Sequence, residues 1–405
     1  MIIEGEMLRS ISKLLVVGLD VTSLAISANR AGYEVYSVDY FGDSDLANVC
    51  SLSLSVTEQK RGISCGRIGF DFDIKDLLVL SKKLVEECEV DGILLSSGLE
   101  DYPRILSALS ELAPIIGNNP KTIRRVREKE FFFAELDRIG VPHPRTEFAE
   151  SLEEAKKKAL DLGYPVVVKP ERGFGGYGLR KATSPKRLEA VFRFNPPADR
   201  FLIQEYIEGK AASASVISTM EDARTLTVNE QLLGRRSLGQ SETFGYCGNI
   251  VPLEISKSVV ELCKKTSEKV VRHFHLLGSN GVDFIIDKRG FPKIVEVNPR
   301  FQGTLECVER VQGINVVKSH IEACTLRALP NLEEARSFCV RLILYALKRL
   351  QVPALNIFDG IRNVPFEGVI IEKGEPFCSV LMEGNSRIGA LQKAEELANS
   401  IYCSI

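Results

Sequence analysis

The chain has little or none of several features that mark particular protein classes. Its 405 residues include no Trp, only four Met and four His, and ten Cys of which no two form a CxxC pair. Cysteines without CxxC spacing argue against a zinc ribbon or a dithiol redox motif and favour a reducing compartment. No apolar run approaches the ~20 residues of a membrane span, and residues 1–6 do not resemble a signal peptide. We therefore expect a cytoplasmic protein.

An excess of charge of either sign is missing as well. Lys and Arg number 52 and Asp and Glu number 54, which gives a net charge of −2 at pH 7. This balance argues against a general nucleic-acid or membrane-surface partner, and the 44% hydrophobic content excludes a disordered chain. At ~150 residues per domain, the length predicts two or three domains that need no disulfide or structural metal.

The first 120 residues alternate short apolar runs with amphipathic segments. Residues 13–18, 34–39 and 92–95 are typical of buried strands, with helical segments between them. The alternation predicts a parallel α/β sheet with ligand sites at the carboxyl edge of its strands. A nicotinamide dinucleotide site is an alternative, because Asp39 lies 21 residues after Gly18. However, the turn after the first strand lacks the further glycines that a pyrophosphate requires.

Beyond residue 120 the pattern becomes a mixture of helices and antiparallel strands. Residues 121–139 are highly charged and predict one helix that ends at a C-cap glycine. Strands dominate from 201 to 231, and a long helix is predicted at 255–276. The last ~70 residues alternate apolar and polar positions and then predict a helix near 390–400.

A strand that carries a lysine into a glycine-rich loop is the first candidate for chemistry. Three valines at 166–168 precede Lys169. Four glycines follow closely: Gly173, Gly175, Gly176 and Gly178. Such a loop can turn backbone N–H groups onto phosphate oxygens while the lysine supplies positive charge. It is not a Walker loop, because no Gly-Lys-Ser/Thr closes it, and a flexible hairpin beside a surface lysine is the alternative.

Two further segments are candidates for chemistry: a strand that ends in polar residues, and two strands that each carry a carboxylate. The strand that runs into Gln204 can offer backbone groups to a purine edge, or it is an ordinary strand end. Glu296 and Asn298 are two residues apart and so share one face of a strand. If residues 288–289 form a two-residue turn, Asp283 lies opposite Ile294 and on the same face. Two carboxylates and an amide oxygen on one face suit Mg²⁺ that bridges phosphates, and a solvated sheet face is the alternative.

Taken in order, these motifs resemble the ATP-grasp superfamily. The matching segments are Lys129 ahead of residues 140–142, residues 165–169 with the glycine loop, residues 204–209 and residues 296–300. The resemblance covers nearly the whole chain and is closest to the predicted ATP-dependent carboligases related to biotin carboxylase. It implies a pre-ATP-grasp α/β domain with a parallel sheet at 1–120, a two-lobed α+β ATP-grasp nucleotide-binding domain at 121–330, and a small β-rich C-terminal lobe at 331–405.

The resemblance implies that ATP is bound between these lobes. Lys129 and Lys169 would contact its α- and β-phosphates, and the glycine loop would close over the triphosphate. Gln204 would face adenine, with the backbones of Glu205 and Ile207 along its edge. This chain departs from the family where members often place an acidic or histidine ribose ligand. Those positions hold Ala211 and Ala212, and Ser213 is a candidate substitute.

The resemblance also implies the metal site and the reaction. Asp283, Glu296 and Asn298 would hold two Mg²⁺ ions, with Mn²⁺ as an alternative and Glu296 as the bridge. Arg300 would be the catalytic residue that stabilises the reacting anion.

The implied enzyme is an ADP-forming carboxylate–amine ligase that acts through an acyl phosphate. A small carboxylic acid and an amine would be its partners, and a homodimer is left open. A biotin-carboxylase-like carboxylation through carboxyphosphate is one alternative. A non-catalytic nucleotide-binding regulator is the other, and it would need neither Arg300 nor a complete metal set.

Overall fold

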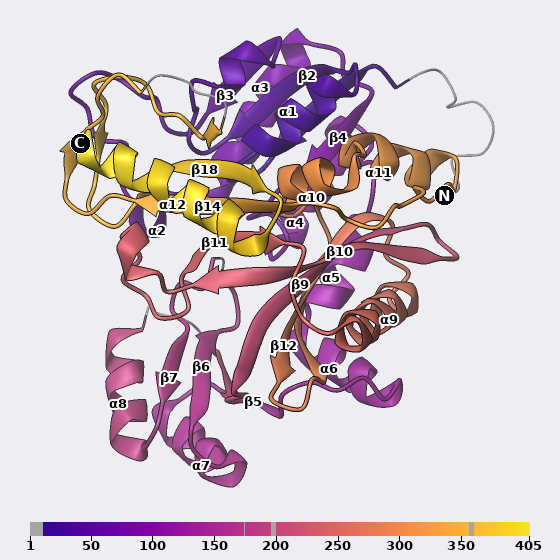
Figure 1. Ribbon diagram of the computed structural model, residues 1–405, viewed down its shortest axis with the longest axis vertical. Helices are drawn as coiled ribbons and strands as arrows, with labels where there is room; N and C mark the ends of the chain where they lie inside the picture. The colour runs from indigo at the N-terminus through magenta and orange to yellow at the C-terminus, as the bar shows by residue number, and fades with distance from the viewer. Residues whose placement is uncertain (1–10, 174, 196–199, 356–359) are drawn as a thin grey trace.

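The N-terminal part of the protein is a parallel α/β sheet. The computed structural model describes residues 11–405 apart from 174, 196–199 and 356–359 (Figure 1). Its first four strands are all parallel, in the order β3-β2-β1-β4. They are β1 (Lys13–Val17), β2 (Glu34–Asp39), β3 (Leu52–Ser55) and β4 (Gly92–Leu95). The helical segments around them are α1 (Thr22–Arg30), η1 (Leu46–Asn48), α2 (Ile68–Asp71), α3 (Ile74–Glu87) and α4 (Pro103–Leu112). The predicted parallel sheet is therefore confirmed.

A small lobe projects from the rest of the molecule, at the bottom of Figure 1. Its four strands are antiparallel, in the order β5-β8-β6-β7. They are β5 (Thr146–Ala149), β6 (Val166–Pro170), β7 (Arg180–Ala182) and β8 (Phe201–Glu205). Helices α7 (Leu152–Leu162) and α8 (Pro185–Phe194) pack on this sheet and share a separate hydrophobic core with it.

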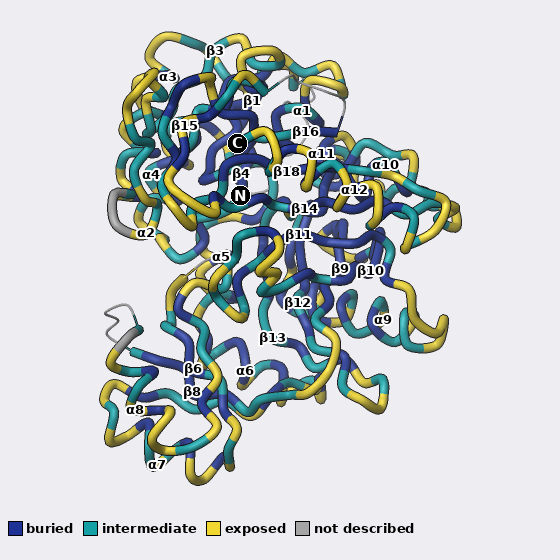
Figure 2. Tube along the Cα trace, turned by 60° about the vertical axis from the view of Figure 1, so that its left-hand side comes forward, coloured by how far each residue is buried: buried dark blue, intermediate teal, exposed yellow. Residues whose placement is uncertain are grey.

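An antiparallel sheet of eight strands forms the centre of the molecule, in the order β13-β12-β9-β10-β11-β14-β18-β16. The first five in sequence are β9 (Gly209–Ser218), β10 (Ala223–Leu233), β11 (Tyr246–Val251), β12 (Gly278–Asp287) and β13 (Pro292–Asn298). The last three are β14 (Phe338–Tyr345), β16 (Ile361–Arg362) and β18 (Pro376–Gly384). Figure 2 shows most of the central strands buried. Strands on both sides of residue 331 share this sheet, so the sheet itself does not mark the predicted boundary at 330. The domain boundaries at 120 and 330 stay a proposal.

Helices cover the large sheet and join it to the N-terminal sheet. They are α9 (Lys257–His273), α10 (Leu305–Gln312), α11 (Val316–Thr325) and α12 (Arg387–Cys403). The remaining short elements are η2 (Arg236–Leu238) and the pair β15 (Leu350–Gln351) and β17 (Ile370–Ile371). One hydrophobic cluster contains Leu24 of α1, Val308 of α10 and Ile321 of α11. In the described part of the chain, none of the helices is both long enough and apolar enough to cross a bilayer.

The prediction of one helix over residues 121–139 is wrong, because the structure has two. They are α5 (Pro120–Arg127) and α6 (Lys129–Arg138). Glu128 separates them with an extended backbone, φ −71° and ψ 99°. The local sequence has no glycine or proline to signal this break. Tertiary contacts explain it instead, because Arg127 and Lys129, on either side of the break, both reach the carboxylate of Glu296.

A buried histidine ties helix α11 to both sheets. His320 Nδ1 accepts a hydrogen bond from the Ser279 N–H at 2.7 Å, and Nε2 donates to the Ile116 carbonyl at 2.9 Å. Its ring also packs against Phe301, with centroids 4.5 Å apart. Burial lowers the pKa of His320 to about 4, and the contact with the Ile116 carbonyl offsets this only in part. The imidazole is therefore neutral in the folded protein near pH 7.

This depressed pKa predicts a pH-dependent contribution to stability. Between the unfolded pKa of about 6.5 and the folded pKa of about 4, the unfolded chain binds the extra proton. The contribution of His320 therefore falls as pH drops through that window, by an amount on the order of 3 kcal/mol. We expect His320→Gln to destabilise the protein most near pH 7 and least near pH 4, as measured by urea unfolding. A wild-type to variant gap that stays constant from pH 7 to pH 4 would contradict this assignment.

Candidate active site

Two carboxylates face each other on the antiparallel pair β12 and β13. The structure pairs Asp283 with Glu296, whereas the two-residue turn predicted Ile294 as its partner. The predicted register is wrong because the turn is longer, with the Asp287 N–H donating to the Phe291 carbonyl, and because the register shifts beyond Asp283. Directly opposed residues share a face of a sheet. The two carboxylates therefore lie on one face, although the pairing differs from the prediction.

Asp283 is held by two side-chain amides. Gln231 Nε2 donates to its Oδ1 at 2.9 Å, and Asn298 Nδ2 donates to its Oδ2 at 2.9 Å. Burial and the nearby Glu296 raise the pKa of Asp283 to about 6, although Arg300 and the Asn298 amide act in the opposite direction. Asp283 is thus the member of the pair that gives up its negative charge more readily.

Glu296 is surrounded by cations. Its Oε1 accepts from Lys129 Nζ at 2.8 Å and forms a close ion pair with Arg127. Arg127 also binds Asp101 in a bidentate pair, at 2.7 and 2.9 Å. Burial alone would raise the pKa of Glu296, but Arg127, Lys129 and Lys169 outweigh it and hold that pKa well below its ordinary value. Glu296 is therefore a permanent anion at neutral pH.

Lys169 brings a third cation to the same place from the small lobe. It lies on β6, and only 7% of it is exposed. Burial lowers the pKa of its ammonium to about 8, and the like charge of Lys129 adds to this, while Glu296 opposes it. A buried lysine whose charge is only partly compensated is suited to take up an anionic ligand.

The glycine-rich loop bends between the small lobe and the large sheet. Gly175, Gly176 and Gly178 have φ values of 59°, 79° and 77°, a region that side chains rarely occupy. A Cβ on Gly176 would meet the Phe244 carbonyl oxygen at 2.1 Å, and the Tyr246 N–H donates to the Gly175 carbonyl at 3.1 Å. The loop thus makes close backbone contact with the segment that enters β11. Gly173 lies at its start, and Phe174 falls outside the described residues.

The predicted adenine-binding residues lie at the end of β8. Gln204 is 4% exposed, and its Nε2 donates to Thr146 Oγ1 at 2.8 Å. The backbone N–H of Glu205 donates to the Arg145 carbonyl at 2.9 Å, so this donor is already used within the protein. Ile207 follows in the link to β9. A purine edge here would rely on the remaining backbone groups of the link.

The two alanines at the expected ribose position lie at the start of β9. Ala212 is buried and pairs with Phe284, so it offers no polar group to a ligand. Ser213 is the cross-strand partner of Asp283, and its Oγ lies 3.5 Å from Asn229 Nδ2. Ser213 therefore faces the carboxylate pair, and its role as a ribose ligand stays a prediction.

Arg300, the predicted catalytic residue, lies where the large sheet meets the N-terminal sheet. Its guanidinium forms a close ion pair with Glu100, whose other oxygen accepts the Gly98 N–H at 2.7 Å. Burial would raise the pKa of Glu100, yet Arg300 and Arg127 lower it overall. Arg300 is therefore fixed beside β12 and β13 by Glu100, which follows strand β4 of the N-terminal sheet.

Sequence reasoning missed four residues of this cluster: Glu100, Asp101, Arg127 and Gln231. Glu100 and Asp101 could have been predicted, because they follow β4 at the carboxyl edge of a parallel sheet, where ligands bind. Arg127 belongs to a basic run that usually marks a solvated helix face, but its side chain is only 7% exposed. In all, four cations and four carboxylates meet here, so the site is close to neutral without a ligand.

The donor set fits Mg²⁺ only together with phosphate. Mg²⁺ usually takes one or two protein carboxylates and completes its shell with water and substrate phosphates. Asp283 and Glu296 supply two carboxylates on one face, with Asn298 beside them. No cluster of three or more Asp, Glu, His or Cys able to hold a metal is found in the described residues. A metal ion would also have to compete with Arg127 and Lys129 for Glu296.

Comparison with known sequences finds a family model that matches part of this chain. Residues 126–304 match the ATP-grasp domain. An uncharacterised protein of Methanocaldococcus jannaschii is 27% identical over 391 residues, which cover 96% of this chain and 91% of that protein. The arginine-specific carbamoyl phosphate synthase large chain of Bacillus subtilis is 25% identical over 260 residues, which cover 62% of this chain. Only 25% of the synthase chain is matched.

Solved structures agree on the fold. The biotin carboxylase domain of Hydrogenobacter thermophilus 2-oxoglutarate carboxylase, solved with MgADP, ADP and bicarbonate, has a TM-score of 0.73. It is 17% identical, and the match covers 94% of this chain and 88% of that one. The L-amino acid ligase of Bacillus licheniformis has a TM-score of 0.70 at 16% identity, covering 96% and 97%. Residues 126–304 therefore match an ATP-grasp domain, and the fold of the chain as a whole is the one that these neighbours share.

The charge arrangement predicts how Glu296 links metal and nucleotide. In Glu296→Gln the buried cations lose their shared anion, so a triphosphate without metal should bind more tightly than to the wild type. With Mg²⁺ the wild type should gain affinity and the variant should not, because one carboxylate is missing. The rate of nucleotide turnover in the variant should fall below about a tenth of the wild-type rate, which corresponds to an increase of at least ~1.4 kcal/mol in the activation free energy. Calorimetry with an ATP analogue, with and without Mg²⁺, measures the coupling.

The matched control is Glu147→Gln, which removes an exposed carboxylate that pairs with Lys158 on the small lobe. It should change neither affinity nor turnover. Equal dependence on Mg²⁺ in the wild type and Glu296→Gln would show that Glu296 does not meet the metal.

Proposed function

We propose that this protein is an ATP-dependent ligase that joins a small carboxylic acid to an amine and releases ADP and phosphate. ATP and Mg²⁺ are its cofactors, with Mn²⁺ as an alternative ion. The single observation that carries the proposal is that three groups of charged side chains meet at one place. They are two buried lysines that could bind phosphates, Lys129 and Lys169, the carboxylate pair of Asp283 and Glu296, and the guanidinium of Arg300, which its ion pair with Glu100 holds in position. The fold supports it, because the ATP-grasp neighbours include a ligase and a carboxylase.

The proposed reaction follows from how these charges are placed. Lys129, Lys169 and the glycine loop would hold the triphosphate, and bound Mg²⁺ would neutralise its negative charge. A carboxylate oxygen of the acid attacks the γ-phosphorus, the bond to the bridging oxygen breaks, and ADP leaves with that electron pair. An amine nitrogen then attacks the acyl carbon, phosphate leaves with the carbon–oxygen pair, and the amine releases a proton. Arg300 would stabilise the oxyanion that develops on the acyl group.

Two other functions remain as outcomes of the same assays. If bicarbonate is the acid, the mixed anhydride is carboxyphosphate, and the carboxylase neighbour was solved with bicarbonate bound. A nucleotide-binding regulator would bind ATP without consuming it. Screening small carboxylic acids, bicarbonate and amines for ATP-dependent phosphate release separates these functions and identifies the acid.

Arg300 provides the test that separates a ligase from a simple nucleotide binder. Arg300 need not touch ATP, so Arg300→Met should keep nucleotide affinity within about threefold, ~0.65 kcal/mol. Ligation should fall roughly a hundredfold or more, as when one oxyanion donor is lost. Calorimetry measures the first quantity, and product formation measures the second.

The ion pair with Glu100 requires a control. Removing one partner of a buried pair leaves the other uncompensated and costs about 3–5 kcal/mol of stability. The double variant Arg300→Met with Glu100→Gln removes both charges and should recover much of that stability without recovering ligation. Ligation that returns in the double variant would show that Arg300 only compensates Glu100.

A further inference from the structure

A short segment carries Arg300 from the end of β13 to the start of α10. We call residues 299–304 the Arg300 segment; they lie outside the helices and strands. Even so, every backbone carbonyl of the segment accepts a hydrogen bond. Backbone carbonyls are mostly paired within helices and sheets. In this segment side chains supply most of the donors, so its position depends on the residues that carry them.

Most of these carbonyls are bound from within the segment or from α10. The Gln302 amide folds back and donates to the Arg300 carbonyl at 2.6 Å, and the Arg300 guanidinium donates to the Phe301 carbonyl at 2.8 Å. Backbone N–H groups at the start of α10 bind two further carbonyls. These contacts give the segment its shape, but they do not attach it to the rest of the protein.

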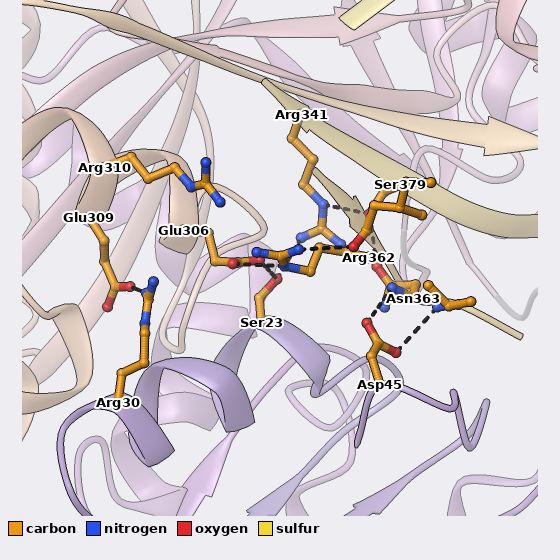
Figure 3. Close-up of polar contacts among 12 residues, drawn as sticks. Ser23, Arg30, Asp45, Glu306, Glu309, Arg310, Arg341, Arg362, Asn363 and Ser379 are labelled. Carbon is orange, nitrogen blue, oxygen red and sulfur yellow. Dashed lines mark hydrogen bonds and ion pairs between the residues drawn. The ribbon is translucent and has the colours of Figure 1, made fainter. Parts of the chain in front are cut away.

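The large sheet holds the far end of the Arg300 segment. Arg341, on β14, donates through Nη1 to the Gly303 carbonyl at 3.1 Å. The guanidinium of Arg341 is itself held, because its Nε donates to Ser379 Oγ of β18 at 3.3 Å (Figure 3). Next to this contact, the Thr304 hydroxyl lies 2.9 Å from Ser215 Oγ of β9. The end of the segment that leads into α10 is therefore attached to three strands of one sheet.

Asn118 holds the near end, immediately before Arg300. It lies in the link between α4 and α5, is only 5% exposed, and donates through Nδ2 to the Pro299 carbonyl at 3.1 Å. Proline has no N–H, so this carbonyl is the only hydrogen-bonding group of its backbone. Nδ2 also donates to Asn280 Oδ1 at 2.8 Å, and Oδ1 accepts the Leu277 N–H at 2.8 Å. Both N–H bonds of the amide and its oxygen are thus in use.

An amide is the side chain that can supply these three hydrogen bonds. A carboxylate accepts but does not donate, a hydroxyl has a single hydrogen, and an ammonium or guanidinium group does not accept. A buried amide that lacked its partners would be costly, so the three bonds select one placement of the side chain. Asn118 therefore fixes the Pro299 carbonyl relative to the start of β12.

Asn118 and Glu100 reach Arg300 from the same part of the N-terminal sheet. Glu100 follows β4 and forms the ion pair with the guanidinium. The stretch that leads to Asn118 runs beside β4, where Ile115 forms a parallel bridge with Ile93. One residue thus holds the head of the arginine side chain, and the other holds the backbone that precedes it.

We propose that Asn118 is a positioning residue for Arg300. The inference rests on the proposed function, in which Arg300 stabilises the oxyanion that develops on the acyl group. Asn118 donates to the backbone of the Arg300 segment and so acts on the reaction only through Arg300. Misplacing an oriented charge lowers the rate of the chemical step and leaves nucleotide binding unchanged, because Arg300 need not touch the nucleotide.

The first test asks whether Asn118 holds the segment, and it uses the full chain without ATP or substrate. Because the Arg300 side chain is largely buried in its ion pair, trypsin can cut after it only when the segment opens. Mass spectrometry follows this cut relative to the cut after exposed Arg327. Asn118→Ala should speed the cut after Arg300 by roughly threefold or more, since proteolysis tracks local opening.

The matched control for this test is Asn119→Ala. Asn119 is the neighbouring residue of the same type, is exposed, and caps α5 by accepting the Thr122 N–H at 2.9 Å. Its loss should destabilise α5 in urea unfolding but leave the cut after Arg300 at the wild-type rate. Equal acceleration in both variants would show general loosening and overturn the proposal.

The second test measures what this contact does for the reaction. Asn118→Ala should lower the kcat of ligation roughly tenfold or more and keep the affinity for an ATP analogue within about threefold. In the Arg300→Met background, the same change should lower ligation further by less than about twofold, because effects that act through one residue do not add. Asn118→Ser, which cannot make all three hydrogen bonds, replaces Asn118→Ala if that variant does not fold.

The outcomes separate this inference from the proposed function. An unchanged cut after Arg300 in the Asn118 variants shows that Asn118 does not hold the segment. Ligation at the wild-type rate despite a faster cut, or losses that multiply in the double variant, overturns the positioning role. If the wild type ligates no acid to any amine, the proposed function fails, and the tryptic cut by itself decides whether Asn118 fixes the Arg300 segment.

Discussion

The candidate active site depends on the sharing of one carboxylate by several buried cations. Glu296 accepts Lys129 and Arg127 and lies in the field of Lys169, while its cross-strand partner is Asp283. Each lysine or arginine alone would be expensive to bury, and each carboxylate likewise. Together they are close to neutral, so the folded protein can hold a strongly charged site ready for a charged ligand. A triphosphate would disturb this balance, and Mg²⁺ that binds with it would offset the added negative charge.

The same contacts connect the three parts of the chain. Lys169 comes from the small lobe, Glu296 from the large sheet and Glu100 from the N-terminal sheet. Lys169 and the glycine loop form one side of the candidate site, and the ion pair of Glu100 with Arg300 fixes the other.

Much of this arrangement could be predicted from the sequence, because it depends on local patterns. Strand and helix periodicity identified the parallel sheet, and a spacing of two residues placed Glu296 and Asn298 on one face. The register of Asp283 was missed because a turn length and a bulge are set by packing. The break at Glu128 was missed because its neighbours are good helix formers, and its cause is the distant Glu296. Pairing between distant residues, as in Glu100 with Arg300, leaves no trace in a single sequence.

In the proposed reaction, a carboxylic acid is phosphorylated beside Arg300 before the amine attacks its acyl carbon. The most direct measurement uses an acid found in the substrate screen, labelled with oxygen-18 in its carboxylate, and follows the label by mass spectrometry. If an acyl phosphate forms, one labelled oxygen moves from the acid into the released phosphate at every turnover, and ADP is the nucleotide product. Phosphate that carries no label, or a product mixture of AMP and pyrophosphate, would contradict the account.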